Sequence, residues 1–411
     1  MKIVGSIHEM RKRRLEILTA ALLGIAALAA SCGQRQTPAA KEQRGDARAA
    51  VDWQANPEWV EARYGGWGGP GVPGGPGPMD GVLLKDYAPK TSVVVPETNV
   101  PKSRYPAIDI HAHVNAKTPT EVAEWVKTMD EVGVQMTVIL TEATGAEFDQ
   151  LAELYLKPYP TRFQLWCGMA TADFAKPDYP ERAAAELVRC YKKGARGIGE
   201  LSDKGHGYGQ DADAPRNQRL HPDDPRLDLF WEKAAELKMP VSLHMADHPS
   251  SWRPPDVFQE RTPVYQTFNQ YGKDIPTYQE LLDIRDKLLA RHPKTVFVAC
   301  HLGNQGNDLA ALGKALDRFP NLYLDISARD YELGRTPRAA VKFLTAHRNR
   351  VLFGTDLDRE KRMYRAWWRL LETGDENMPG RVWWRYYGLE LSPPALEALY
   401  RGVATQILNR E

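Results

Sequence analysis

The chain alternates short apolar runs with stretches of helical periodicity from Ile108 to the C-terminus. The short runs are rich in β-branched and aromatic residues, which favours buried strands, whereas the stretches between them favour amphipathic helices. Eight runs occur, at Ile108–Ala112, Val134–Leu140, Phe163–Met169, Ala195–Leu201, Val241–His244, Thr295–Cys300, Leu322–Ile326 and Val351–Phe353. Eight consecutive strand–helix units predict an α/β fold, a (β/α)8 TIM barrel.

The predicted helices show apolar residues at three- and four-residue spacing. The clearest are Glu121–Val132, Glu181–Lys193, Leu227–Lys238, Tyr278–Arg291 and Pro337–His347. An open doubly wound sheet is the alternative arrangement of such units. That fold usually has a glycine-rich phosphate loop after an early strand, but the glycine-rich stretch here, Gly65–Gly77, precedes every predicted strand. The pattern therefore favours a closed barrel.

The N-terminal segment is typical of an export signal. Basic residues at 11–14 precede a mostly apolar stretch, 17–30, that is short for a membrane span. Leu28–Gly33 resembles the lipobox of bacterial lipoproteins, with alanine in place of leucine three positions before Cys32. We expect a signal peptide over residues 1–32 and lipidation of Cys32; a plain secretory signal cut near Ala30 is the alternative. The expected location is the bacterial cell envelope or periplasm, with membrane contact only through the lipid anchor.

Composition divides the remainder of the chain into three parts. Residues 33–81 are rich in Gly, Pro and Ala and predict a flexible tether, because such a segment buries too little apolar surface to offset its ordering entropy. Residues 82–105 are an extended lead-in, and residues 106–411 carry the barrel.

The net charge of +1 and the absence of a basic stripe argue against a nucleic-acid partner. Three cysteines in the barrel are too few for a disulfide framework, and it stays open whether Cys167 and Cys190 meet.

Polar groups recur where predicted strands end. In a barrel these ends share one face, which is where barrel enzymes carry their catalytic groups. Five of the eight strands end in this way, with His111 and His113, Glu200, His244, His301 and Asp356. His111 and His113 lie two residues apart on a strand and therefore point the same way. Singly, His244 could be a rim histidine and Asp356 a helix N-cap. Together, the five ends predict one site.

This ordered set of motifs resembles the amidohydrolase superfamily, and within it the amidohydrolase-2 branch that contains aminocarboxymuconate semialdehyde decarboxylase. Supporting motifs are His111-Ala112-His113, Pro240–His244, Leu352–Asp356 and a terminal helix over Leu396–Leu408, within a similarity that spans roughly Pro106 to Asn409. The resemblance implies that His111, His113 and His244 bind a divalent metal, with zinc expected, and that Asp356 is a fourth ligand. It also implies that His301 or Asp356 transfers the proton.

Glu200 decides how many ions we expect. In the superfamily, many members with one ion lack a carboxylate at the end of strand four, whereas some members with two ions have a bridging residue there. We expect Glu200 to touch metal or substrate; a salt bridge to Lys204 or Arg196 is the alternative. One ion is expected, or two if Glu200 bridges them.

Three further residues are weaker candidates for substrate contact: Arg329, His206 and His248. Arg329 could pair with a substrate carboxylate, although a structural pair with Asp330 or Glu332 explains it equally well. His206 lies in a polar, glycine-rich loop after the fourth strand, and His248 follows the fifth.

Three other features concern residues around the predicted site and in the outer layer of the barrel. Cys300 precedes His301, so we expect it to point away from the site as a buried thiol. The connection Met245–Ile275 is long for a compact domain, and we expect it to be either a lid or a cover of the barrel rim. The aromatic residues near the C-terminus, including Trp367 and Trp368, are expected to pack the outer layer.

The expected activity is metal-dependent hydrolysis of an amide, ester or lactone in a small molecule. A non-oxidative decarboxylase or hydratase on the same scaffold is the alternative. A binding lipoprotein without turnover is a third hypothesis, which the full set of candidate ligands disfavours.

Overall fold

The structure is a computed structural model that describes residues 81–83, 86, 90–209, 215–254, 268–382 and 384–408. Contacts divide the chain between Thr91 and Ser92, and all of the strands and helices described here belong to the second unit. The predicted signal peptide, Cys32 and nearly all of the predicted tether lie outside the described residues. Within the described ranges, no helix is both long and apolar enough to cross a membrane.

Eight parallel strands follow one another around a single sheet in chain order. They are β1 (Ala107–Ala112), β2 (Val134–Leu140), β3 (Phe163–Cys167), β4 (Gly197–Asp203), β5 (Val241–Met245), β6 (Phe297–Ala299), β7 (Leu322–Asp325) and β8 (Val351–Leu352). The sheet nearly closes, because the Ile110 N–H donates to the Phe353 carbonyl (3.0 Å) and the Asp356 N–H donates to the His111 carbonyl (2.8 Å). This confirms the predicted (β/α)8 barrel.

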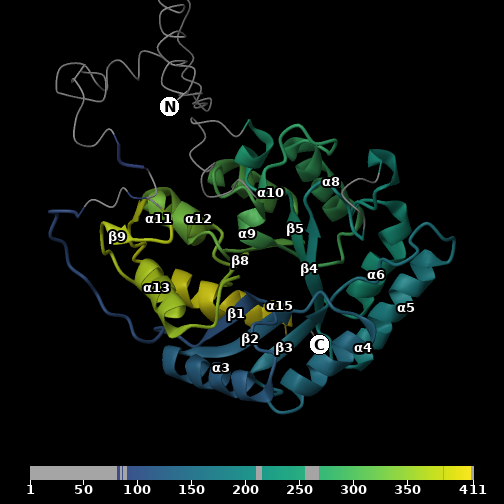
Figure 1. Cartoon of the computed structure of the whole chain (residues 1–411), viewed down its shortest axis with the longest axis horizontal. Helices are drawn as coiled ribbons and strands as arrows, with labels where there is room; N and C mark the ends of the chain where they lie inside the picture. Colours follow the sequence, from purple (N-terminus) through teal and green to yellow (C-terminus); the bar gives the residue numbers. More distant parts are fainter. Residues whose placement is uncertain are drawn as a thin grey trace, which may run out of the picture. The chain divides into compact units, whose positions relative to one another are not determined.

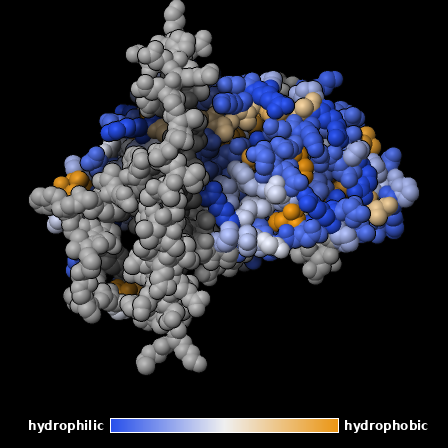
Figure 2. All heavy atoms as spheres, turned by 90° about the horizontal axis from the view of Figure 1, so that it is seen from above, coloured by the Kyte–Doolittle hydropathy of each residue, from blue (hydrophilic) through white to orange (hydrophobic). Residues whose placement is uncertain are grey.

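Helices separate the strands and surround them (Figure 1). The longer ones are α3 (Pro119–Val132), α5 (Tyr179–Lys192), α6 (Asp228–Glu236), α8 (Tyr278–Arg291), α10 (Leu309–Arg318), α12 (Pro337–Ala346) and α13 (Lys361–Glu372). The shorter ones are α4 (Gly145–Leu151), α9 (Cys300–Gly303), α11 (Asp330–Arg335), α14 (Pro393–Glu397) and α15 (Val403–Leu408). A small hairpin pairs β9 (Met378–Pro379) with β10 (Arg385–Tyr386). On the face drawn in Figure 2, the described residues are mainly hydrophilic, and apolar side chains occupy small separate areas.

Capping decides where two of the predicted helices begin. The Thr118 side chain caps α3 in a capping box with Glu121, so this helix begins two residues earlier than its apolar periodicity predicts. Thr277 and Glu280 form the same motif at the start of α8, where the predicted and observed helices agree.

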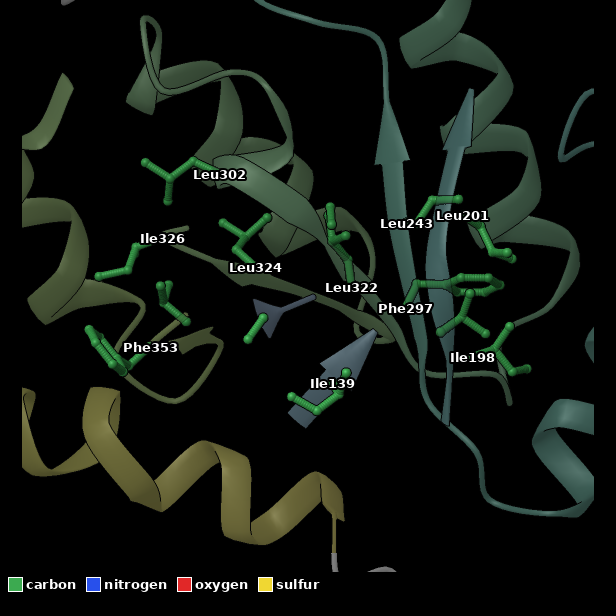
Figure 3. Packing of buried hydrophobic residues seen from close by; sticks show 14 of the residues in the cluster. Ile139, Ile198, Leu201, Leu243, Phe297, Leu302, Leu322, Leu324, Ile326 and Phe353 are labelled. Carbon is green, nitrogen blue, oxygen red and sulfur yellow. The ribbon is translucent and has the colours of Figure 1, made fainter. Parts of the chain in front are cut away.

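Alternate strand residues belong to two different apolar clusters. One face of the sheet packs against the surrounding helices and includes Ile139, Leu243 and Phe297 (Figure 3). The opposite residues, such as Val138 and Trp166, form an inner cluster; its members outside the strands are Val403, Ala404, Ile407 and Leu408 of α15. The C-terminal helix therefore supplies part of the barrel interior. The aromatic residues Trp367 and Trp368 pack in the outer cluster, as predicted.

Gly197 on β4 makes room for the buried ring of Trp166. A Cβ atom at position 197 would lie 2.3 Å from the indole. We expect Gly197→Ala to lower the free energy of unfolding by about 2 kcal/mol, because the ring must leave its packed position. Urea unfolding of the metal-free protein measures this effect. The control is Gly402→Ala, whose Cβ would have no neighbour nearer than 3.7 Å and which should not be destabilised. Equal unfolding midpoints for the two variants would contradict the role of Gly197.

Candidate metal centre

The Glu200 carboxylate lies at the centre of the predicted site. It is within 3.4 Å of His111 Nε2, 3.2 Å of His113 Nε2 and 3.5 Å of His301 Nε2, and it hydrogen bonds His244 Nδ1. The two alternative partners are engaged elsewhere: Lys204 pairs with Asp247 (3.3 Å), and Arg196 donates to the Ala195 carbonyl (2.8 Å). The strand-end groups that the sequence singled out therefore meet in one place.

Each carboxylate of the cluster divides its oxygens between two groups of histidines. Glu200 Oε2 faces His111 and His113, and Oε1 faces His244 and His301. Asp356 follows the same division, because Oδ1 lies 3.6 Å from His111 Nε2 and 3.2 Å from His113 Nε2, while Oδ2 lies 3.8 Å from His301 Nε2. The site thus contains two histidine pairs joined by two carboxylates.

The spacing of the first histidine pair and the carboxylate oxygens fits a divalent ion. Four ligands about 2.0–2.2 Å from a tetrahedral ion stand about 3.3–3.6 Å from one another. The nitrogen-to-oxygen distances from His111 and His113 to Glu200 and Asp356 are 3.2–3.6 Å. In addition, His111 Nε2 is buried and has no hydrogen-bond partner among the described residues. A buried polar nitrogen without a hydrogen-bond partner is costly, and a bound ion would satisfy it. His111, His113, Glu200 and Asp356 would hold that ion.

The charges of the cluster also call for a cation. Burial raises the pKa of Glu200, but the adjacent His244 and His111 outweigh this effect and bring it well below its usual range. Burial lowers the pKa of His113, but hydrogen bonds to Asp356 and Glu200 raise it to about 9. Without metal, protons on His111, His113 and His244 therefore balance the carboxylates. A divalent ion would replace those protons, so its binding should release them.

Asp325 orients the first ligand, and the sequence reasoning missed this residue. Its Oδ2 accepts from His111 Nδ1 (2.9 Å), and its Oδ1 accepts from the His301 N–H (2.8 Å) and the Ser327 N–H (3.0 Å). The Nδ1–H tautomer of His111 leaves the lone pair on Nε2, where the ion would bind. Asp325 is the last residue of β7, so a carboxylate at the end of a predicted strand was the signal available in the sequence.

We expect Asp325→Asn to weaken divalent-metal affinity by about 10–100-fold. When the asparagine oxygen accepts from the His301 and Ser327 amides, its NH2 group faces His111 Nδ1 and favours the tautomer that has its proton on Nε2. Competition with a fluorescent zinc chelator measures the affinity. Asp203→Asn is a matched control, because Asp203 is fully buried but contacts no histidine of the cluster. Equal affinities in the two variants would show that Asp325 does not set the tautomer.

A cavity of about 250 Å³ opens beside the second histidine pair, and we call it the metal-facing cavity. His244, His301 and Asp356 line it, together with Lys204, Asp247, His248, Ser251, Phe268, Ala328, Arg329, Leu357 and Arg381. Ser251 and Phe268 come from the two described ends of the long connection after β5, whose middle, 255–267, lies outside the described residues. The choice between a lid and a rim cover therefore stays a prediction.

The three weaker candidates have different positions. Arg329 lines the metal-facing cavity and also pairs with Glu332 (3.4 Å), one of the structural alternatives, whereas Asp330 pairs with Arg381. His248 lines the cavity and lies 3.5 Å from Glu332. His206 is absent from the wall of this cavity.

The loop that carries His206 is held by hydrogen bonds to the buried Asp203. Asp203 accepts hydrogen bonds from the amides of Gly205 (2.8 Å) and Gly207 (2.9 Å) and contacts His221 Nδ1 (2.6 Å). These contacts account for the polar, glycine-rich composition of the loop without a ligand.

The prediction that Cys300 points away from the site is wrong. Its sulfur lies 3.0 Å from Ser242 Oγ, and it belongs to a close group with His111 and Asp325 beneath the ligands. Strand alternation would separate Cys300 from His301, but His301 has a left-handed backbone (φ 59°) that turns its side chain back inward. Burial raises the pKa of the Cys300 thiol, consistent with the predicted unreactive sulfhydryl. Cys167 and Cys190 are free buried thiols, and the neighbouring Cys190 raises the pKa of Cys167.

Comparison with known families decides the assignment. The family model described as amidohydrolase matches residues 108–410, which include all of the strands except the first residue of β1, and the whole ligand set. The chain belongs to the amidohydrolase family. Comparison with curated proteins gives no match. As a member of this family, the chain is a metal-dependent enzyme of the hydrolase or decarboxylase type.

Solved structures of low sequence identity share the fold. A candidate amidohydrolase from Staphylococcus aureus is 16% identical over 74% of this chain and 99% of its own, with a TM-score of 0.50. A 5-carboxyvanillate decarboxylase from Novosphingobium aromaticivorans, solved with manganese, is 14% identical over 76% of this chain and 99% of its own, with a TM-score of 0.48. An amidohydrolase from Burkholderia multivorans with bound zinc is 16% identical over 74% and 99%, with a TM-score of 0.44. At these identities the likeness concerns the barrel alone.

Proposed function

We propose that this amidohydrolase is a hydrolase with two divalent ions, zinc being the expected metal, that cleaves an amide, ester or lactone of a small molecule. The supporting observation is the Glu200 carboxylate, whose two oxygens face two different histidine pairs. A carboxylate in that position is suited to join two ions. In this proposal His111 and His113 would hold one ion and His244 would contribute to the other, with the Glu200 carboxylate placed between the two positions.

When bound, the ions would supply the Lewis acidity that makes water a nucleophile near neutral pH and polarises the substrate carbonyl. The protein residues position these groups and carry the proton. His301 Nδ1 donates to the Ser327 carbonyl (3.0 Å), so Nε2 holds a lone pair directed at the carboxylates. The proton of the attacking water passes to His301 Nε2 or to Asp356 Oδ2, which lie 3.8 Å apart, and then to the leaving group.

Metal content and product analysis test this function. The purified full chain should hold stoichiometric zinc or another divalent ion and should hydrolyse members of an ester, lactone and amide panel. Release of carbon dioxide from carboxylate substrates, with no activity on that panel, would favour the decarboxylase alternative and overturn hydrolysis. A protein without stoichiometric metal, whose stability and ligand binding are unchanged in His111→Ala/His113→Ala, would indicate a binding lipoprotein instead.

We also propose that the protein is exported and lipid-anchored through Cys32. The motif around Cys32 and the basic residues before the apolar stretch support this location. Membrane fractionation and labelling with radioactive palmitate test it, with Cys32→Ala as the comparison. Equal labelling of both forms would contradict lipidation at Cys32.

A further inference from the structure

A second cavity, of about 650 Å³, lies between the lead-in and a C-terminal part of the barrel, and we call it the distal cavity. One wall comes from residues 97–100 of the lead-in, one from α13, and one from the β9–β10 hairpin. None of the residues predicted to bind metal lines it. No role assigned above accounts for this space.

The two cavities share a partition made of two side chains, Leu357 and Arg381. Leu357 directly follows the candidate ligand Asp356. Arg381 Nη2 donates to the carbonyl of Ala328 (2.7 Å), which lines the metal-facing cavity, and its guanidinium pairs with Asp330, which lines the distal cavity (2.8 Å). A molecule that passes this partition would contact both spaces.

The wall of the distal cavity is apolar at depth and charged at its rim. Buried residues of the wall are Met363, Trp367, Leu370, Met378 and Tyr386. The exposed charged residues of the wall are Glu97, Asp358, Arg362, Arg365 and Arg381, and the charge of Arg381 is paired with that of Asp330. Such a wall suits an uncharged apolar group better than an ion, because neither sign dominates its rim.

Trp367 adds an unsatisfied hydrogen-bond donor to this apolar wall. Its side chain is 2% exposed, and its indole Nε1–H has no hydrogen-bond partner in the part of the chain that the structure describes. A buried donor without an acceptor is costly. An ether or carbonyl oxygen on a bound molecule could satisfy it.

Size separates the roles of the two spaces. Sites for small organic ligands usually measure about 300–1,000 Å³. The metal-facing cavity, at about 250 Å³, is smaller than this range, whereas the distal cavity lies within it. We propose that the distal cavity binds the apolar arm of an elongated substrate whose reacting group lies at the metal centre. The inference rests on the proposed hydrolase function for the position of the reacting group, but not for the binding of the arm.

The first test measures the distal cavity without using the metal. Nile red, a neutral dye that fluoresces in apolar surroundings, should bind the full chain at one site, with or without metal. Ala366→Trp should weaken this binding by about tenfold or more, because Ala366 lines the cavity and a bulky ring would fill it. Ala339→Trp on α12 is the matched control, since Ala339 is also exposed on a helix but lines neither cavity. Absent binding, or equal binding by both variants, would overturn the proposal.

The second test connects the two cavities. Linear alkyl hydroxamic acids bind divalent metals through a constant head group, so acetohydroxamic acid should occupy the metal centre alone. Lengthening the chain to octanohydroxamic acid should improve inhibition by up to about fourfold per methylene once the chain enters the distal cavity. Ala366→Trp should remove this gain and leave acetohydroxamic acid unaffected.

The outcomes distinguish the two proposals. Dye binding that is sensitive to Ala366→Trp, without inhibition by acetohydroxamic acid, would refute the metal-dependent function and leave the distal cavity as a binding site. Inhibition by acetohydroxamic acid without any gain from chain length would refute the distal arm and leave the metal centre intact.

Discussion

Glu200→Gln is expected to reduce the metal content from two divalent ions per chain to one and to lower turnover by about two to three orders of magnitude. The carboxylate is acceptor-only, and both of its oxygens face histidine nitrogens. A glutamine keeps one oxygen and replaces the other with an NH2 group that has no lone pair for an ion. One of the two histidine pairs therefore faces an NH2 group in place of a carboxylate oxygen, and the ion at that pair loses a ligand.

Metal analysis after exhaustive dialysis, combined with kcat on the best substrate of the panel, measures this effect. The matched control is Glu142→Gln, because Glu142 approaches a single histidine, His113 Nδ1 at 3.5 Å, and its side chain is 60% exposed. This control should retain two ions and most of the activity. One ion in the wild type and in both variants would refute the shared site, although a mononuclear hydrolase would remain compatible with such a result.

Asp109→Ala is expected to lower the free energy of unfolding by about 4 kcal/mol. Asp109 is fully buried on the helix-facing side of β1, and its carboxylate accepts hydrogen bonds from four donors. Its Oδ1 accepts from the amides of His111 (3.3 Å) and Thr355 (3.0 Å), and its Oδ2 accepts from the hydroxyls of Thr355 (2.8 Å) and Tyr364 (3.2 Å). Alanine leaves all four donors buried without this acceptor.

The same hydrogen bonds connect the first strand of the barrel to the segment after the last strand, and both carry candidate ligands. Asp109 connects β1, which bears His111, to the segment that precedes Asp356. We therefore expect Asp109→Ala to weaken metal binding as well as the fold. Urea unfolding of the metal-free protein isolates the stability effect. Asp109→Asn is the conservative comparison and should lose less, because its amide oxygen replaces one acceptor and the two hydroxyls can turn to accept from its NH2 group. An unfolding midpoint for the alanine variant equal to that of the wild type would contradict this role.

Sequence periodicity predicted the strands well because their environment is uniform. Each strand has one face toward the helices and one toward the barrel interior, so both faces are apolar and the runs are continuous. The starts of all eight strands lie within two residues of the predicted starts. Periodicity was less informative where the backbone is irregular. A register shift between Asp109 and Ala112 turns His111 toward the site while Asp109 faces the helices, although the two are an even number of residues apart.

The sequence by itself determined the barrel and the strand ends that carry the metal-binding groups. The alternation of apolar strand runs with amphipathic helical stretches, and the order of these segments, can be read directly from the chain. It also contained the family motifs. Only the tertiary structure decided how Glu200 shares its oxygens between two histidine pairs and that Asp325 holds His111. The distal cavity likewise depends on segments that begin at residues 97, 361 and 378. Such arrangements depend on distances between atoms far apart in the chain, which folding alone brings together.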